Sequence, residues 1–425
     1  MQWLVARSTG DAGRSRFSFR KTAATGAMLV VAALGAWESF PSSRQLVRQA
    51  SESSAAYQKI GYLPDLYVAY VAGDGRMFGI EDHFIYVSED HGRSFRQLGA
   101  LPKVRPGWRA RALNLLARSK LVRSIRRNQG PSNLVVLSTG TILVFWDHIY
   151  RSTDNGRTFA PVFDFSAQKV NEPFPNGEGL AVGPDDTVYF AEYAMSKRPN
   201  EVKIYEGRED GTVWKTAYAF GRGEIFHVHG IQYDPYRLGY WITTGDLDSE
   251  SKIMFTGDGF KSFRVLGEGS QDWRVVSVMI TKDRLVWGSD NDQASAGIFH
   301  WDFRGGALTK LQAIGKPAYS SRMLADGTFV LSTTYEPHSH YTLKHHPEPS
   351  TDLWTSRDGI AWTKLLSLPH EMRRLASGPS RAQIAFPRGA KTRELFFTPL
   401  CTAEAEFTTQ LIQPMSAALS ARSSP

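Results

Sequence analysis

The fold of this chain is decided by the octapeptide STDNGRTF, residues 152–159. It lies between two apolar runs with the β-branched and aromatic content of strands. Asp154 can fold its carboxylate back onto backbone N–H groups, and Gly156 supplies a positive φ that other residues resist. Phe159 can tuck its ring under the turn while Ser152 ties the near side. These residues predict a self-contained hairpin turn, which we call a clip.

The clip recurs along the chain. Residues 88–95, SEDHGRSF, repeat the whole pattern. Partial copies centred on Asp210, Asp258 and Asp358 keep the Asp and a terminal aromatic residue, and a decayed copy falls at residues 303–308. Successive centres, counted from position 90, are 64, 56, 48, 45 and 55 residues apart. A period near 50 residues, with four strand-like runs in each unit, is typical of propeller blades.

The repeated pattern resembles the Asp-box, or bacterial neuraminidase repeat (BNR repeat), S-x-D-x-G-x-[ST]-[FW], of the sialidase-like propeller superfamily. That resemblance implies an all-β fold, and we expect a six-bladed β-propeller. The alternative is a seven-bladed ring, in which residues 382–386 and 394–398 join an N-terminal strand near residues 58–62. Members of this superfamily differ in function, so the clip predicts the fold and leaves the activity to other residues.

Residues 1–37 are expected to be a signal peptide or an uncleaved signal anchor. Arg and Lys residues precede an uncharged apolar run of thirteen, residues 25–37, which has the length of an h-region and is short for a membrane span. A buried core helix is the alternative for this run. Cys401 is the only cysteine, and export without disulfides suits a bacterial periplasm. The prediction is an exported protein of the periplasm or cell envelope, tethered to the membrane if the signal is retained.

The remaining boundaries follow from composition. Polar, Ser-rich residues 38–56 are expected to form a linker, residues 57–400 the propeller, and Ala/Ser-rich residues 401–425 a flexible tail. Residues 105–127 hold eight cations and no acid, and their apolar residues fall near one helical face. We expect an inserted basic helix that lies on the propeller wall, on anionic lipid or on an acidic polymer. Cations concentrated in one segment of an exported protein do not favour nucleic acid as a partner.

Blade topology predicts where the functional residues lie. If the clips join the third and fourth strands of each blade, the start of the first strand and the end of the second lie on the opposite face. The predicted catalytic residues at these positions are Glu178, Glu192, Asp246, Asp290, Tyr335 and Glu336. The predicted substrate-binding residues are His227, His229, Arg274 and Arg322. No metal ion or other cofactor is expected, because two histidines are too few without partners; a four-histidine site with His338 and His340 is the alternative.

These residue types favour a carbohydrate ligand. Glycoside hydrolysis uses two carboxyl groups, or in sialidases a Tyr backed by a carboxylate, and Arg274 and Arg322 could hold a substrate carboxylate. The resemblance therefore implies a glycosidase-like protein acting on an acidic glycan. The sialidase motif Arg-Ile-Pro is absent, and the incomplete arginine triad argues against a true exo-sialidase. The alternatives are a polysaccharide lyase on uronate sugars, with Tyr335 or a His as base, and a non-catalytic envelope propeller that binds a glycan or a protein.

Overall fold

The computed structural model describes residues 43–49, 56–102, 133–168, 170, 177–193, 200–293, 295–337, 349–371, 374–375, 378–379 and 381–414. The expected signal segment, the basic helix at residues 105–127, and His338 and His340 lie outside the described residues. Within the described part, which belongs to one compact unit of the chain, the regular elements are strands and three short 3-10 helices. None of its helices has the length and apolar character of a membrane span.

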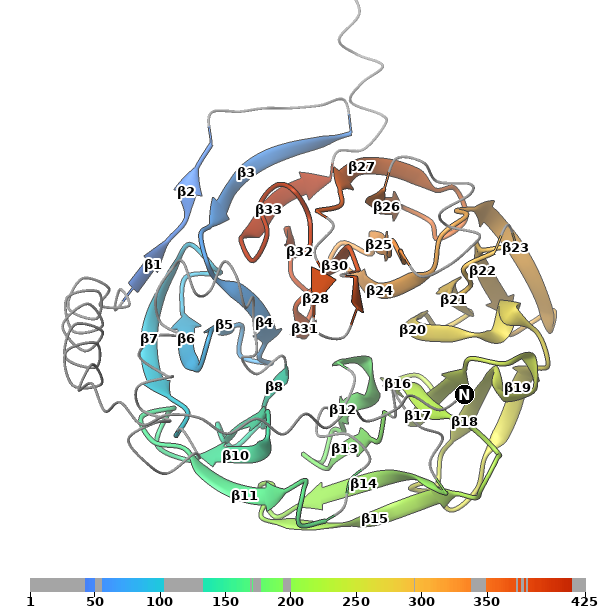
Figure 1. Cartoon of the computed structure of the whole chain (residues 1–425), viewed down its shortest axis with the longest axis horizontal. Coiled ribbons are helices and arrows are strands. Elements are labelled where there is room, and N and C mark those ends of the chain that lie inside the picture. The colour runs from blue at the N-terminus through green and yellow to red at the C-terminus, as the bar shows by residue number, and fades with distance from the viewer. Residues whose placement is uncertain are drawn as a thin grey trace, which may run out of the picture. The chain divides into compact units, whose positions relative to one another are not determined.

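Four-stranded antiparallel sheets are arranged radially around a central axis (Figure 1). In the first six, chain order runs from the inner strand to the outer one. Blade one contains β4 (Tyr67–Val71), β5 (Met77–Glu81), β6 (Phe84–Ser88) and β7 (Ser94–Ala100). Blade two contains β8 (Asn133–Val136), β9 (Ile142–Phe145), β10 (His148–Ser152) and β11 (Ala160–Asp164). Blade three contains β12 (Leu180–Val182), β13 (Val188–Ala191), β14 (Val202–Arg208) and β15 (Val213–Phe220).

The next three blades repeat this arrangement. Blade four contains β16 (His227–Asp234), β17 (Gly239–Gly245), β18 (Lys252–Thr256) and β19 (Arg264–Glu268). Blade five contains β20 (Val275–Ile280), β21 (Arg284–Ser289), β22 (Gly297–Asp302) and β23 (Ala307–Ala313). Blade six contains β24 (Ala318–Met323), β25 (Phe329–Thr333), β26 (Ser350–Ser356) and β27 (Thr363–Pro369). The three 3-10 helices are η1 (Gly177–Gly179), η2 (Asp248–Glu250) and η3 (Gln271–Trp273).

The ring has seven blades, so the expectation of six is wrong and the seven-bladed alternative is correct. Blade seven contains β30 (Gln383–Ala385), β32 (Leu395–Leu400), β33 (Thr409–Pro414) and β3 (Tyr57–Leu63). The N-terminal β3 pairs antiparallel with the C-terminal β33, and Figure 1 shows them side by side in blue and red. This blade has no clip of its own among the described residues, which is why a count of clips stops at six.

Two boundaries expected from composition also change. β33 lies within residues 401–425, which were expected to form a flexible tail. The sequence did not reveal this strand because it is buried on both faces and so shows no polar–apolar alternation. Part of the expected linker forms edge strands: β1 (Ser43–Gln45) pairs with β7, and β2 (Val47–Arg48) pairs with β3. Two further short elements belong to the last part of the chain. β31 (Arg388–Gly389) pairs in parallel with β4 at the axis, and β28 (Arg374–Leu375) pairs with β29 (Gly378–Pro379).

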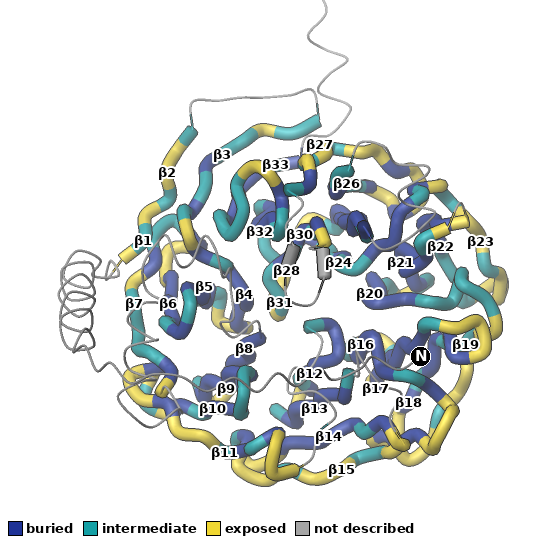
Figure 2. The backbone as a smooth tube through the Cα atoms, in the orientation of Figure 1, coloured by how far each residue is buried: buried dark blue, intermediate teal, exposed yellow. Residues whose placement is uncertain are grey.

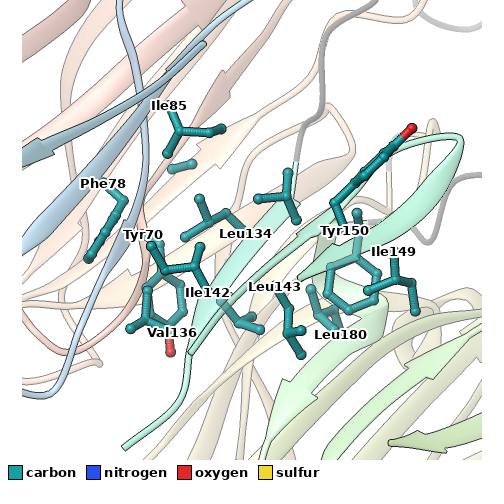
Figure 3. Close-up of a cluster of buried hydrophobic side chains, with 14 of the residues drawn as sticks. Tyr70, Phe78, Ile85, Leu134, Val136, Ile142, Leu143, Ile149, Tyr150 and Leu180 are labelled. Atoms are coloured by element: carbon teal, nitrogen blue, oxygen red, sulfur yellow. The ribbon is translucent and has the colours of Figure 1, made fainter. Parts of the chain in front are cut away.

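Apolar side chains fill the spaces between neighbouring blades. Tyr70 and Phe78 of blade one share a cluster with Leu134 and Ile142 of blade two and Leu180 of blade three (Figure 3). Inner strands are buried along most of their length, whereas the outermost strands are largely exposed (Figure 2). The burial pattern explains why inner strands read as continuous apolar runs, since both faces of each blade pack against a neighbour.

The clips form as expected at the turns between third and fourth strands. In blade two, the Asp154 carboxylate accepts the Thr158 N–H at 3.0 Å and the Thr158 hydroxyl at 2.6 Å. The Ser152 hydroxyl accepts the Gly156 N–H at 2.9 Å, and Gly156 has a φ of 79°. The clips around residues 90, 258 and 358 use equivalent bonds. The partial copy in blade three differs, because the Asp210 carboxylate accepts from Thr139 of blade two instead.

Replacing Asp154 by Asn is expected to lower the melting temperature at neutral pH without changing ligand binding at the opposite face. Hydrogen bonds from Thr158 lower the pKa of Asp154 to about 2. A carboxyl whose folded pKa lies below its unfolded value stabilises the fold at neutral pH, and that contribution disappears as the pH falls from about 4 to about 2. Thermal unfolding followed over this range should therefore show a smaller acid-induced loss in the Asn variant. An unchanged acid profile would contradict this assignment.

Replacing Leu411 in β33 by Ala is expected to destabilise the whole ring. Leu411 is fully buried in the cluster that joins blade seven to blade one. Truncation of such a side chain costs about 2–5 kcal/mol. The matched control is Leu238→Ala, since Leu238 is 71% exposed. Denaturant unfolding of the two variants compares them directly, and equal stability would mean that β33 is not part of the cooperative core.

Candidate functional site

The face opposite the clips carries a cluster of polar residues around the central opening. They come from the starts of inner strands and from the turns that follow second strands, as the blade topology predicted. We call this group the mouth cluster and define it as Tyr193, His227, His229, Asp246, Arg274, Asp290, Tyr319, Glu336 and Arg381. Inner strands β16, β20 and β24 each contain a register shift near this end. Such bulges re-aim side chains and are frequent beside functional sites.

A histidine pair opens blade four. His227 and His229 lie on one face of β16, and their Nε2 atoms are 2.9 Å apart. His229 Nδ1 lies 3.1 Å from the Val275 carbonyl oxygen, which fixes its proton on Nδ1 and leaves a lone pair on Nε2. The Tyr193 ring stacks on His227 with a centroid distance of 3.9 Å. The orientations of both imidazoles are therefore set by neighbours in adjacent blades.

Asp246 completes this part of the cluster from the turn after β17. Its Oδ1 lies 3.5 Å from His227 Nε2 and 3.6 Å from His229 Nε2. Burial lowers the pKa of His229 to about 4, so this imidazole is neutral at neutral pH. Although burial alone would raise the pKa of Asp246, the contacts with both histidines and Arg274 lower it. Two imidazoles and a carboxylate so close together form the group of described residues that could hold a metal ion.

Arg274 bridges two carboxyl groups. It follows η3 at the start of blade five, and its NH2 atom lies 3.0 Å from Asp246 Oδ1 while its Nε lies 3.2 Å from Asp290 Oδ2. Burial raises the pKa of Asp290 to about 8 in spite of Arg274, and the negative charges of Glu336 and Asp246 add to the rise. The Asp290 N–H donates to the Arg274 carbonyl at 2.7 Å, so the backbone fixes the spacing of the two side chains.

A tyrosine–glutamate pair lies beside these groups. The Tyr319 hydroxyl, from β24, donates to Glu336 Oε1, and Arg381 Nε lies 3.3 Å from the same oxygen. Burial raises the pKa of Tyr319, and the charges of Asp290 and Glu336 raise it further. Exposure increases outward through the cluster: the side chain of Asp290 is 5% exposed, that of Glu336 15% and that of Arg381 44%. Of these three side chains, that of Arg381 is therefore the most accessible to solvent.

Six of the ten predicted site residues come together in the mouth cluster: His227, His229, Asp246, Arg274, Asp290 and Glu336. Glu178 and Arg322 pair with each other instead, through two hydrogen bonds of 2.8 and 3.1 Å that join blades three and six. They line an axial cavity of about 390 Å³, which also contains Arg388. Glu192 accepts hydrogen bonds from Lys203 N and Tyr205 within blade three.

Tyr335 is buried against His370, and its backbone pairs with Ala382. The tyrosine that contacts Glu336 is Tyr319, which sequence reasoning missed although it stands at the start of a first strand. Arg381 was missed because it precedes β30, in a blade whose strands carried no repeat signal. The same start-of-strand rule finds Tyr319, and it finds Arg381 once blade seven is known.

Comparison with known proteins gives the fold. No protein-family model matches this chain, and no curated protein matches it. Similar solved structures include an oligogalacturonate lyase in complex with manganese (TM-score 0.51, 9% identity, covering 88% of this chain and 96% of that one). A mitotic checkpoint complex has a TM-score of 0.49, 11% identity and coverages of 97% and 99%. A streptogramin B lyase has a TM-score of 0.47, 10% identity and coverages of 83% and 94%.

At these identities, structural likeness shows a fold and no activity. The resemblance to sialidase-like proteins is supported as far as the propeller, and no match supports the family itself.

Arg274→Met is expected to destabilise the protein by about 2–3 kcal/mol, because it leaves the Asp246 and Asp290 carboxyls without their shared cation. The loss is smaller than for a fully buried ion pair, since the Arg274 side chain is 20% exposed. Adding Asp246→Asn should recover most of the loss, because the pKa of Asp246 is lowered and this carboxyl is therefore ionised at neutral pH. The matched control is Arg304→Met, whose ion pair with Asp283 is exposed and should cost little. Denaturant unfolding measures the wild type, the two single variants, the double variant and the control, and additive losses in the double variant would contradict the coupling.

On this evidence the chain is a seven-bladed β-propeller with its polar cluster at the face opposite the clips.

Proposed function

We propose that the mouth cluster is the active site of a glycosidase-like enzyme acting on a glycan that carries a carboxylate. The observation that carries this proposal is the hydrogen bond from the Tyr319 hydroxyl to Glu336, with Arg381 on the same carboxylate oxygen. A tyrosine held by a glutamate can serve as a nucleophile, because the carboxylate can take the phenolic proton during attack. Being neutral at rest, tyrosine avoids the repulsion that a carboxylate nucleophile would feel from an acidic sugar.

Two guanidinium groups suit the substrate carboxylate. Arg381 contacts Glu336, and Arg274 is near enough for the charges of Tyr319 and Glu336 to raise its pKa. Guanidinium groups bind carboxylates through paired N–H donors. Each already contacts a carboxylate of the protein, Asp246 and Asp290 for Arg274 and Glu336 for Arg381. A substrate carboxylate would share these cations and be oriented by them. Arg322, the other arginine predicted to bind a substrate carboxylate, instead forms an ion pair with Glu178.

The proposed reaction has two steps. Tyr319 attacks the anomeric carbon through its oxygen while its proton passes to Glu336; the bond to the leaving oxygen breaks, and that oxygen takes a proton from water at the mouth, which leaves hydroxide. A second water then attacks the covalent intermediate, and Glu336 returns its proton to the phenolic oxygen. The remaining proton of that water neutralises the hydroxide. Two displacements at one carbon retain its configuration.

A second candidate is β-elimination on a uronate sugar, and the histidine pair favours it. His227 and His229 place imidazole nitrogens next to Asp246 and Arg274. An imidazole would take the proton α to the sugar carboxylate, the bond from the β carbon to its oxygen would break, and that oxygen would take a proton from water. The product carries a carbon–carbon double bond. The similar structure of an oligogalacturonate lyase shows that this fold is compatible with such chemistry in another protein.

Export to the periplasm or cell envelope, with or without a membrane tether, stays part of the proposal on the strength of residues 1–37 alone. An envelope location would bring the mouth cluster into contact with acidic polysaccharides. The proposal of export and the proposal of enzymatic activity are independent, because the activity of the mouth cluster is tested on the purified full chain.

The decisive comparison is Tyr319→Phe against Tyr335→Phe. The full chain is incubated with fluorogenic glycosides of sialic and uronic acids and with uronate polymers. We expect fluorophore release, a loss of at least about 100-fold in Tyr319→Phe, and near wild-type release in Tyr335→Phe, because that tyrosine is buried away from the mouth.

If the protein forms an ultraviolet-absorbing unsaturated product and releases no fluorophore, the reaction is β-elimination and the proposal of hydrolysis is wrong. Glycan binding without turnover would support the non-catalytic propeller and overturn both enzymatic proposals. Equal activity of the two Phe variants would exclude Tyr319 as the nucleophile.

A further inference from the structure

The geometry of the mouth cluster points to a divalent metal site. We propose that His227 Nε2, His229 Nε2 and Asp246 Oδ1 together bind a divalent transition-metal ion, with the remaining coordination positions open to the mouth. This inference goes beyond the proposed function and does not depend on it, since binding of the ion is measured without any substrate. It replaces the expectation, drawn from the sequence, that two histidines lack a partner for a metal.

The three donor atoms already have the spacing that an ion requires. They form a triangle with sides of 2.9, 3.5 and 3.6 Å. The point equidistant from all three lies about 1.9 Å from each, which is the circumradius of that triangle. Zinc binds imidazole nitrogen and carboxylate oxygen at about 2.0–2.2 Å. An ion at that distance from all three atoms would lie about 0.5–1 Å out of their plane.

The protonation state of one ligand is set for metal binding. His229 donates its Nδ1 proton to the Val275 carbonyl, so its Nε2 carries a lone pair that can bind an ion. A backbone carbonyl on the second ring nitrogen is the usual outer-shell partner of a metal-bound histidine. His227 is held in place by the stacked Tyr193 ring. A proton on His227 Nε2 accounts for the short contact between the two imidazoles. To bind an ion through Nε2, the neutral His227 ring would carry that proton on Nδ1 instead.

The Arg274 cation is the main electrostatic cost of this site. Its NH2 atom contacts Asp246 Oδ1, the same oxygen that would bind the ion. A carboxylate oxygen has two lone pairs, so one can accept from Arg274 while the other binds the metal.

Asp246 is 32% exposed, so the ion would be reachable from solvent and would attract anionic ligands. The donor set of two imidazoles and one carboxylate suits Zn²⁺ and Mn²⁺ better than Mg²⁺ or Ca²⁺, which prefer all-oxygen ligands.

The test is ion binding to the untagged full chain after treatment with a chelator. Titration calorimetry with ZnCl₂ and, separately, MnCl₂ is expected to show one saturable ion per chain. Asp246→Asn should weaken binding at least about 10-fold, because it removes the anionic ligand with little change in shape. Asp147→Asn is the matched control: Asp147 follows the second strand of blade two as Asp246 follows that of blade four, and its variant should bind normally.

His338, His340, His345 and His346 lie outside the described residues and could bind metal by themselves. The titration is therefore repeated in a variant with all four changed to Ala, which is expected to retain the tight ion. Co²⁺ added to this variant should give visible absorption bands that Asp246→Asn abolishes. Absence of a saturable ion, loss of the ion in the four-histidine variant, or unchanged binding in Asp246→Asn would each overturn the proposal.

Discussion

The pairing of β3 with β33 is the constraint on which the rest of this structure depends. Residues from the two ends of the described chain form one ladder, from Tyr57 opposite Pro414 to Leu63 opposite Thr409. An open ring would leave two blade faces with apolar side chains in water, whereas closure buries them on both sides. Closure also fixes the angle between successive blades, because the apolar side chains of each blade must pack against both neighbouring blades. The mouth cluster therefore occupies a frame that no single blade could provide.

The frame allows charged groups to approach one another where they would otherwise repel. Asp246, Asp290 and Glu336 arise from three different blades, and each meets a guanidinium group, Arg274 for the first two and Arg381 for the third. Arg274 compensates the Asp246 carboxylate and Arg381 compensates the Glu336 carboxylate, whereas burial raises the pKa of Asp290 and disfavours its charge. Such a network is rigid when empty and offers directed donors to an acidic ligand, which is the physical basis of both enzymatic proposals.

The axis of the ring holds a second, different arrangement. Glu178 and Arg322 span the centre from blade three to blade six, and Arg388, on the short strand beside β4, donates to the Leu180 carbonyl. These contacts connect blades that are not neighbours. Two of the residues that the sequence suggested for the site, Glu178 and Arg322, therefore pair with each other across the ring and lie outside the mouth cluster.

The sequence by itself determined the clips, the all-β fold, the face on which the polar cluster gathers and six members of that cluster, since these follow from local turn chemistry and blade order. Asp246 and Asp290, for instance, each follow a second strand, a position readable without coordinates. Only the tertiary structure decided the number of blades, because β33 and β3 are 346 or more residues apart and neither carries a repeat.

It also decided that Tyr319, and not Tyr335, meets Glu336. Tyr335 follows β25 and is buried against His370, whereas Tyr319 reaches Glu336 from β24. Local sequence patterns predict how a turn is stabilised and which face of a strand each side chain occupies. They do not record which side chains meet across a closed ring, because that depends on packing among all seven blades at once.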